Sequence, residues 1–159
     1  MAVARVIEEP AWSAREWPMT RQAWEALDAD AATLARRVQA EDGYTTGRLD
    51  GDADAPSFVP NVVGQQLARQ LTTVKEVLAG AVVVEDPELA VIGRRVTLTE
   101  ADGAESTYAL VIPGEGDPRN GWVSVDSPVG SALLGRRVGE MVTISAPSGA
   151  WTATISRIE

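Results

Sequence analysis

The spacing of hydrophobic residues changes along this chain near Asp86 and Pro87, and it divides the chain into two parts. Before this point hydrophobic residues recur every three or four positions, which is the spacing of one face of an α-helix. From Val91 onward they alternate with polar residues, as in a half-buried β-strand. The pattern therefore predicts an α+β protein in which a helical region precedes a sheet domain.

The first helical pattern follows Thr20, a residue type that caps helix N-termini. We expect this helix to run from Met19 to about Asp42, where Gly43 and Tyr44 end it. Its hydrophobic seam consists of Trp24, Leu27, Ala31, Leu34 and Val38, at intervals of three and four. Such a seam indicates packing against another element and by itself says nothing about function.

A second helical pattern runs from about Asn61 to Ala79, and Gly80 fits its C-terminal stop. Its seam consists of Leu67, Leu71, Val74 and Leu78. Two amphipathic helices of similar length predict an antiparallel hairpin, a short coiled coil, over residues 19–84. Residues 1–18 are expected to form an irregular N-terminal extension, because chain ends are usually loosely packed.

Five alternating runs in the second part predict the strands of a sheet. They read RRVTLTE, STYALVI, GWVSVD, EMVTISA and WTATISRI. Turn signals at Asp102-Gly103 and Ser148-Gly149 indicate antiparallel hairpins. One short helix is expected from Ser127-Pro128 to about Gly135. Residues 85–159 are therefore assigned to a domain with an antiparallel sheet and a single short helix.

The short helix begins directly after a strand, at Asp126, Ser127 and Pro128. Ser127 or Asp126 can cap the helix, and proline suits the first helical position because its missing N–H would have no partner there. Capping is one explanation of this corner. A docking surface for a partner is the other, and the local sequence leaves both open.

The composition removes several kinds of chemistry. The chain has no cysteine and no histidine, which excludes disulfides, Cys/His zinc sites and histidine-based catalysis. Carboxylates remain as metal ligands, and they prefer hard cations such as Mg²⁺. The net charge of −9 disfavours direct binding to DNA or RNA and favours basic partner surfaces. Neither a long apolar run nor a secretion signal is present, so we expect a cytoplasmic protein without membrane association.

Residues 43–60, between the two helices, are rich in glycine, proline and aspartate. Loops of this length are uncommon in compact domains and tend to be functional or disordered. The loop carries the alternating carboxylates of Asp50, Asp52 and Asp54. Their spacing is similar to the start of a calcium loop, but Ala55 and Asn61 replace its glycine and its bidentate glutamate, which excludes an EF-hand. A solvated acidic loop and a carboxylate cluster at the hairpin tip both stay open.

The second half of the chain resembles the bacterial transcript-cleavage factors GreA and GreB. The resemblance is carried by Ser127-Pro128, by the Ala-Leu-Leu-Gly segment 132–135, by Val138-Gly139-Glu140 and by Pro147-Ser148-Gly149, in that order. The first half shares less with the family, chiefly Met19-Thr20-Arg21 at the start of the first helix and the junction at residues 84–87.

This resemblance implies a fold and a partner. In the family the sheet domain is FKBP-like and binds the rim of the secondary channel of bacterial RNA polymerase, while the hairpin reaches through the channel to the active centre. Carried over, Asp126, Ser127 and Pro128 are expected to contact the polymerase. Arg136 belongs to a basic pair that follows the short helix, and from its position we expect it to assist this contact. The chain would then be a monomeric regulator and not an enzyme. It would contact DNA and RNA only indirectly and would have no cofactor of its own.

The hairpin tip departs from the family pattern. Members that stimulate cleavage carry a motif similar to Gly-Asp-Leu-Ser-Glu-Asn, whose two acids help to hold a second Mg²⁺ in the polymerase. A second metal stabilises the attacking and leaving oxygens of phosphodiester hydrolysis. Here Asp54 matches the aspartate, but Ser57 stands at the glutamate position. We therefore expect a channel-binding factor that modulates, and by preference inhibits, transcription without stimulating cleavage.

Two alternatives stay open at this stage. The tip aspartates, chiefly Asp52 and Asp54, would hold the second Mg²⁺ themselves, which would make the chain an active cleavage factor. Alternatively, the sheet domain is a binding module for a different protein. Prolyl isomerase activity is disfavoured for the sheet domain. A shared fold alone does not establish a shared activity, and the second half of the chain has few aromatic residues. Two of these, Trp122 and Trp151, are expected in the core.

Overall fold

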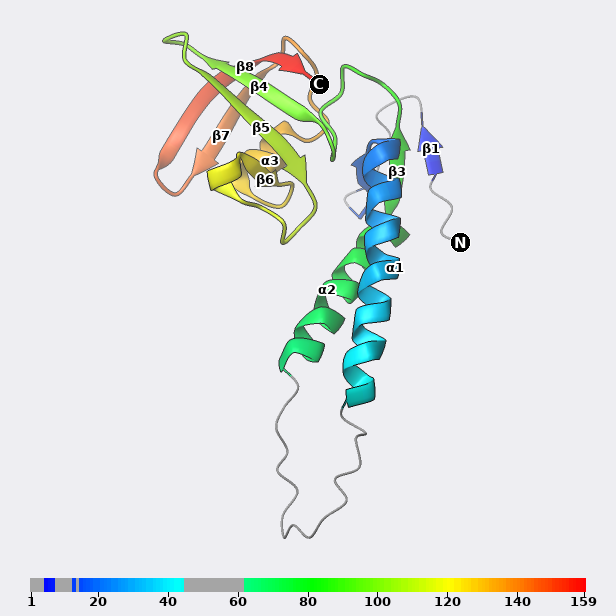
Figure 1. The fold of residues 1–159 in the computed structure, drawn as a ribbon. Coiled ribbons are helices and arrows are strands. Elements are labelled where there is room, and N and C mark those ends of the chain that lie inside the picture. Colours follow the sequence, from blue (N-terminus) through cyan, green and yellow to red (C-terminus); the bar gives the residue numbers. More distant parts are fainter. Residues whose placement is uncertain (1–4, 8–12, 14, 45–61) are drawn as a thin grey trace, which may run out of the picture.

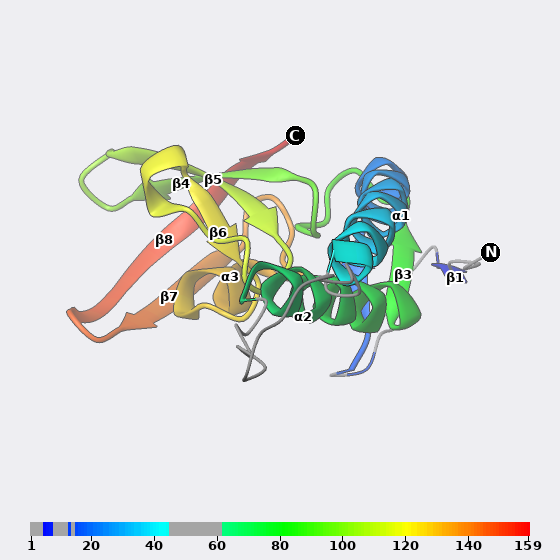
Figure 2. The same cartoon turned by 60° about the horizontal axis from the view of Figure 1, so that its bottom comes forward.

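The computed structural model describes residues 5–7, 13, 15–44 and 62–159, and it has two parts. A hairpin of two long helices projects from a small, curled sheet domain (Figure 1). Figure 2 shows that the sheet domain lies on one side of the hairpin, and that strand β1 (Arg5–Ile7) lies on the other. The predicted order, with helices before the sheet domain, is confirmed.

The hairpin consists of α1 (Arg21–Tyr44) and α2 (Val62–Ala79), which pack along one another. Most residues of the two predicted seams are buried or half-buried at this contact: Leu27, Ala31, Val74 and Leu78 are buried, and Trp24, Leu34 and Leu71 pack against them. The spacing of hydrophobic residues therefore identified the packing faces of both helices correctly.

Thr20 caps α1, as predicted. Its Oγ1 accepts a hydrogen bond from the Ala23 N–H at 3.1 Å, and its carbonyl accepts one from the Trp24 N–H at 3.0 Å. Met19 is not helical, in contrast to the prediction: it ends strand β2 (Trp17–Met19), and its side chain is fully buried. One cap residue separates the strand from the helix, and hydrophobic spacing does not locate so short a transition.

A small parallel sheet at the base of the hairpin was not predicted. Its order is β1–β3–β2, with β3 (Ala81–Val84) in the centre and buried along its whole length. The expectation that residues 1–18 are irregular is therefore wrong for the two segments that form β1 and the start of β2. Both segments are only three residues long and pair with residues far along the chain, so they leave no local periodic signal.

Gly80 ends α2 as predicted, but for a reason of packing. A Cβ at this position would lie 2.6 Å from the carbonyl oxygen of Arg15, and the Trp17 N–H donates a hydrogen bond of 2.7 Å to the Gly80 carbonyl. The glycine thus allows the segment that enters β2 to cross closely over the end of the helix.

All five predicted runs of the second part form strands, in the order β6–β5–β4–β8–β7. Their bounds are β4 (Arg95–Glu100), β5 (Glu105–Val111), β6 (Trp122–Ser124), β7 (Met141–Ala146) and β8 (Gly149–Ile158). The pairs β4–β5, β4–β8 and β7–β8 are antiparallel, as predicted. The pair β5–β6 is parallel, which corrects the prediction of a purely antiparallel sheet.

The parallel pair arises from the connection between β5 and β6. This segment contains the 3₁₀ turn η1 (Pro118–Asn120), which brings the chain back to start β6 beside β5 in the same direction. The short helix α3 (Pro128–Leu133) then packs against the sheet, most closely against β7. A curled sheet with one short helix is the α+β arrangement that the alternating pattern predicted.

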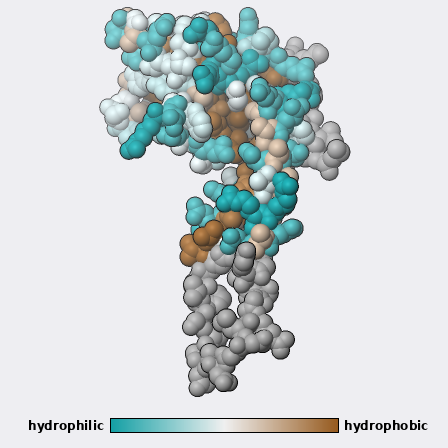
Figure 3. Space-filling view, in the orientation of Figure 1, coloured by the Kyte–Doolittle hydropathy of each residue, from teal (hydrophilic) through white to brown (hydrophobic). Residues whose placement is uncertain are grey.

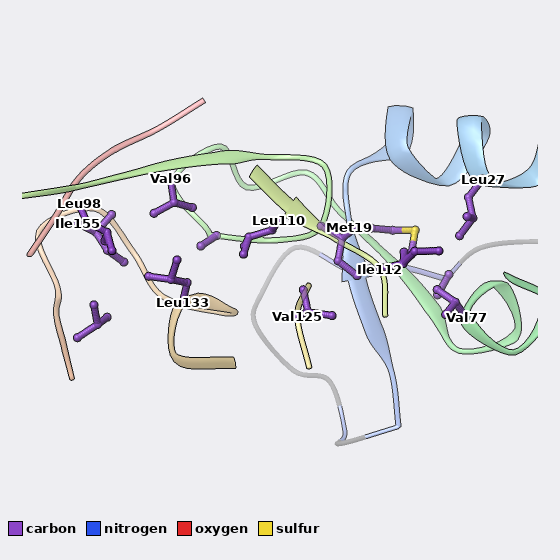
Figure 4. Close-up of a cluster of buried hydrophobic side chains, with 14 of the residues drawn as sticks. Met19, Leu27, Val77, Val96, Leu98, Leu110, Ile112, Val125, Leu133 and Ile155 are labelled. Carbon is purple, nitrogen blue, oxygen red and sulfur yellow. The ribbon is translucent and has the colours of Figure 1, made fainter. Parts of the chain in front are cut away.

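One hydrophobic core runs through both parts of the molecule (Figure 4). Leu27 and Val77 of the hairpin, Met19 of β2, and Ile112 and Val125 of the sheet domain belong to one cluster of buried side chains. The cluster continues into the sheet domain through Val96, Leu98, Leu110, Leu133 and Ile155. The boundary near Asp86 is therefore not a gap in the core.

The chain crosses between the two parts at Asp86. The Arg137 guanidinium lies 2.8 Å from the Asp86 carboxylate, and Arg94 donates a hydrogen bond of 2.8 Å to the Pro87 carbonyl. The Asp86 carboxylate also accepts a hydrogen bond from the Glu88 N–H at 3.0 Å. This backbone hydrogen bond, together with Arg137, holds the pKa of Asp86 below its ordinary value.

Candidate partner-binding corner

Ser127 occupies the corner between β6 and α3 and fixes its shape. Its backbone is extended, and its Oγ accepts a hydrogen bond from the Gly130 N–H at 3.1 Å. The same hydroxyl donates to the Ser124 carbonyl at 2.6 Å, and the Ser127 N–H donates to that carbonyl at 2.9 Å. The predicted cap is confirmed, with Pro128 at the start of the helix as expected.

Asp126 is held from the other side of the corner. Its carboxylate accepts a hydrogen bond from the hydroxyl of Ser124, which is buried. The residues Asp126 and Pro128 themselves are exposed, whereas Ser127 between them is half-buried. The corner therefore presents a carboxylate and a proline ring to the outside on a backbone that the two serines hold in place.

Gly130 explains how α3 approaches the end of β6 so closely. A Cβ at Gly130 would lie 2.0 Å from the Ser124 carbonyl oxygen and 2.8 Å from the Val125 Cα. Any side chain here would displace the backbone of the corner, because such contacts are far below van der Waals distance. The small residue is thus part of what sets the geometry at Asp126 and Pro128.

The structure separates the two arginines that follow α3. The Arg136 side chain is exposed, with its guanidinium 3.5 Å from the carboxylate of Glu140. Arg137 instead binds Asp86 at the junction between the two parts. Arg136 is therefore available at the surface of the same domain as the corner, whereas Arg137 serves the fold.

Trp122 differs from the prediction that it lies in the core. Its side chain is 46% exposed, whereas Trp151 packs against the core cluster as predicted. Trp122 belongs to β6, which stands at one end of the strand order and forms an edge of the sheet in the described part of the chain. An alternating pattern predicts two faces for a strand but does not reveal that a strand lies at the edge.

The predicted acidic tip residues Asp50, Asp52 and Asp54 lie outside the described residues, as do Ser57 and most of the 43–60 loop. Gly43 and Tyr44 belong to the end of α1 and do not interrupt it, which corrects their assignment to the loop. Within the ranges that the structure describes, no group of three or more acidic side chains gathers to hold a metal ion. Over the same ranges, no helix has the length and hydrophobicity to cross a bilayer.

The fold defines a class of protein: a two-part molecule in which a helical hairpin projects from a small sheet domain that carries the capped surface corner. The family model described as "Transcription elongation factor, GreA/GreB, C-term" matches residues 86–159. Transcription elongation factor GreA of Geobacillus kaustophilus is 31% identical over 144 residues, which covers 85% of this chain and 91% of that protein. GreA of Macrococcus caseolyticus is 32% identical over 143 residues, with 85% and 90% covered.

The chain belongs to the GreA/GreB family of transcription elongation factors. Among solved structures, GreA factor homolog 1 (Gfh1) of Thermus thermophilus is similar at 24% identity and a TM-score of 0.42, over 91% of this chain and 99% of that one. The family assignment rests on the sequence relatives.

Proposed function

We propose that this chain binds bacterial RNA polymerase at the rim of the secondary channel and modulates transcription without stimulating transcript cleavage. Membership of the GreA/GreB family of transcription elongation factors supports RNA polymerase as the partner. The observation that carries the proposal is the corner, where Asp126 and Pro128 are exposed on a backbone held by Ser127 and Ser124. Ordered, exposed groups bind a partner with little loss of conformational entropy.

The hairpin supports a role inside the channel. Helix α1 has 24 residues, which corresponds to about 36 Å at 1.5 Å per residue. It is anchored at its base by the shared core, so its free end is directed away from the sheet domain (Figure 1). A rigid projection of this kind, entering beside the catalytic centre, would obstruct nucleotide entry or place carboxylates near the catalytic Mg²⁺.

The tip sequence separates inhibition from cleavage. Hydrolysis of the transcript is promoted by carboxylates that help hold a second metal ion. This chain has Asp54 but carries Ser57 where the second acid would stand. With the glutamate missing, we propose that the hairpin enters the channel without completing that metal site.

The test is promoter run-off by the cognate polymerase, with wild type and Pro128→Ala compared over a range of concentrations. Run-off is expected to fall with wild type. Pro128→Ala is expected to need roughly tenfold more protein for the same effect, because it removes an exposed contact at the corner. Ser131→Ala, a change on the exposed side of α3, is the matched control and should behave as wild type.

Two other results would change the proposal. Normal run-off with tight binding of a different protein at the corner would favour an FKBP-like module with another partner. Inhibition that is equal for wild type and Pro128→Ala would show that the corner does not contact the polymerase.

A further inference from the structure

Strand β3, at the base of the hairpin, is buried on both of its faces. Ala81 belongs to the main core cluster, whereas Val82 and Val84 form a second cluster with Leu89 and Val91. All residues of β3 are at most 7% exposed. Because consecutive residues of a strand point to opposite faces, a charged side chain anywhere in β3 would be buried without a partner, at a high cost in free energy. Contacts with further strands are therefore made only at the two edges of β3.

One edge of β3 is covered by β2, and the far side of β2 is paired in turn. The Ile92 N–H donates a hydrogen bond of 3.0 Å to the Pro18 carbonyl, and the Thr20 N–H donates one of 2.9 Å to the Ile92 carbonyl. Between these two hydrogen bonds, Met19 forms a parallel bridge with Ile92. In the described part of the chain, this side of the small sheet is therefore closed against the sheet domain.

The other edge of β3 is covered by β1. The two strands pair in parallel over three residues, from Arg5 opposite Val82 to Ile7 opposite Val84. In the strand order β1 is outermost, and Figure 2 shows it on the side of the hairpin that faces away from the sheet domain. Among the residues that the structure describes, β1 alone pairs with this edge. Its removal would leave the edge open to solvent.

The sequence of β3 makes an open edge hazardous. It reads AVVV, an uncharged hydrophobic run of high β-propensity, and such segments pair readily with other chains. Proteins protect edges of this kind with charged residues, with proline, with short strands or with a covering element. Burial on both faces rules out charged residues in β3, so a covering strand is the protection that remains.

Strand β1 has the features of a strand that ends a sheet. It is three residues long and begins with Arg5, and in the sequence it is followed by Glu8, Glu9 and Pro10. Short length, charge and proline each disfavour pairing with a further strand. The addition of β1 thus replaces a continuous hydrophobic edge by a short edge with charges close to both ends.

The hydrophobic surface of the molecule lies away from β3. On the face in view, Figure 3 shows it at the junction between the two parts and at the end of the hairpin. The exposed large hydrophobic side chains of the described residues are Val62, Val63, Trp122, Val138 and Met141. None of them belongs to β3, so this apolar strand is hidden while β1 is in place.

We propose that β1 blocks self-association of this chain by occupying the edge at which β3 would otherwise pair with β3 of a second copy. Two identical edges pair about a two-fold axis, with their strands antiparallel. Because β3 has no charged residue, this pairing places no like charges opposite one another. The chain is then a monomer while β1 is paired, and displacement of β1 leads to dimers.

The test is the mass of the full chain in solution, measured by light scattering over a range of concentrations. The variant Val6→Pro with Ile7→Pro removes two consecutive N–H groups of β1. Since the N–H groups of a strand point alternately to its two sides, one of the two removed groups faces β3. The mean mass of the variant is expected to double as its concentration rises, while wild type keeps the mass of one chain.

The matched control is Ala2→Pro with Val3→Pro, which introduces the same two prolines before β1. It is expected to keep the mass of one chain. Circular dichroism verifies that the helices of both variants form. Hydrogen exchange locates the contact: in the associated Val6→Pro, Ile7→Pro variant, the amides of β3 are expected to stay protected, because a second copy of β3 replaces β1.

A synthetic peptide with the sequence of residues 1–12 provides the second measurement. Added in excess, it is expected to return the Val6→Pro, Ile7→Pro variant to the mass of one chain by pairing with the edge of β3. The same peptide with both prolines is its control and should have no effect.

Three results would overturn the proposal. The first is a Val6→Pro, Ile7→Pro variant that keeps the mass of one chain at all concentrations, because β3 would then need no cover. The second is association that the peptide does not reverse or that leaves the amides of β3 unprotected, because the contact would then lie elsewhere. The third is wild type that associates as strongly as the variant, because β1 would then block nothing.

Discussion

Ser127 caps α3 and fixes the corner before it with one side chain. Its hydroxyl satisfies the Gly130 N–H at the start of α3 and also donates to the Ser124 carbonyl at the end of β6. The residues on either side of it, Asp126 and Pro128, are exposed. The two explanations that the sequence left open for this corner are therefore compatible, because the cap fixes the surface that a partner would meet.

Replacing the Ser127 hydroxyl tests whether the cap of α3 stabilises the fold. Ser127→Ala should lower the free energy of unfolding by about 1 kcal/mol, the usual effect of losing a serine cap. Ser131→Ala is the control, since its hydroxyl is exposed and makes only a hydrogen bond of 3.3 Å to the Pro128 carbonyl. Urea unfolding measures both. Equal stability of Ser127→Ala and wild type would mean that the cap contributes nothing measurable to the corner.

At the scale of elements, hydrophobic spacing predicted both helices and all five strands of the sheet domain. It predicted them because each presents one face to a core, and such a face has a fixed period. It missed β1, β2 and β3, which are three or four residues long, and the parallel pairing of β5 with β6. Residues 81–84, assigned to the hairpin, form the central strand of the small sheet. These features depend on contacts between distant segments, which no local period encodes.

The junction between the two parts makes stability depend on pH through Asp86. Because the folded-state pKa of Asp86 is lowered, its contribution is fully present above the ordinary pKa of 3.8 and is lost as the pH falls through the lower, folded value. Asp86→Asn should therefore be less stable than wild type at neutral pH. The difference in unfolding free energy should shrink toward zero below pH 3.8.

The control for this experiment is Asp28→Asn, an exposed change on α1. It removes the same charge away from the junction, and its unfolding free energy at neutral pH should stay close to that of wild type. A difference between Asp86→Asn and wild type that stays constant from neutral to acidic pH would contradict the role given to the Asp86 carboxylate.

At the scale of the whole molecule, the shared core joins the hairpin to the sheet domain. Leu27 of α1 and Ile112 of the sheet domain lie in one buried cluster. A packing defect in the hairpin should therefore destabilise both parts. Leu27→Ala should cost about 2–4 kcal/mol, as is usual for a buried leucine. Gln39→Ala, an exposed change on the same helix, should cost little.

Hydrogen exchange followed by mass spectrometry shows whether the loss of stability in Leu27→Ala extends to both the hairpin and the sheet domain. In Leu27→Ala the amides of α1 and of β4 and β8 are expected to lose protection together. Loss confined to the hairpin, with β4 and β8 protected as in wild type, would show that the two parts unfold independently.

The sequence singled out the corner residues as candidates because a cap and a family motif coincide there, and the structure confirms the cap. The sequence did not reveal that Arg137 binds Asp86, or that Trp122 is exposed at a sheet edge. The acidic residues of the hairpin tip lie outside the described residues, so what is said of them rests on the sequence alone. The central claim about function depends on these residues. That claim is that the chain acts on RNA polymerase while Ser57, in place of the second acid, leaves cleavage unstimulated.

The most direct measurement is the rate of transcript cleavage in halted elongation complexes of the cognate polymerase at fixed Mg²⁺, with and without this chain. A cleavage-competent GreA in parallel reactions shows that the complexes can respond. The expected result is an unchanged cleavage rate at concentrations of the chain that reduce promoter run-off. Faster cleavage with wild type that is lost in Asp54→Ala would contradict the proposal, because the tip aspartates would then have replaced the missing pair.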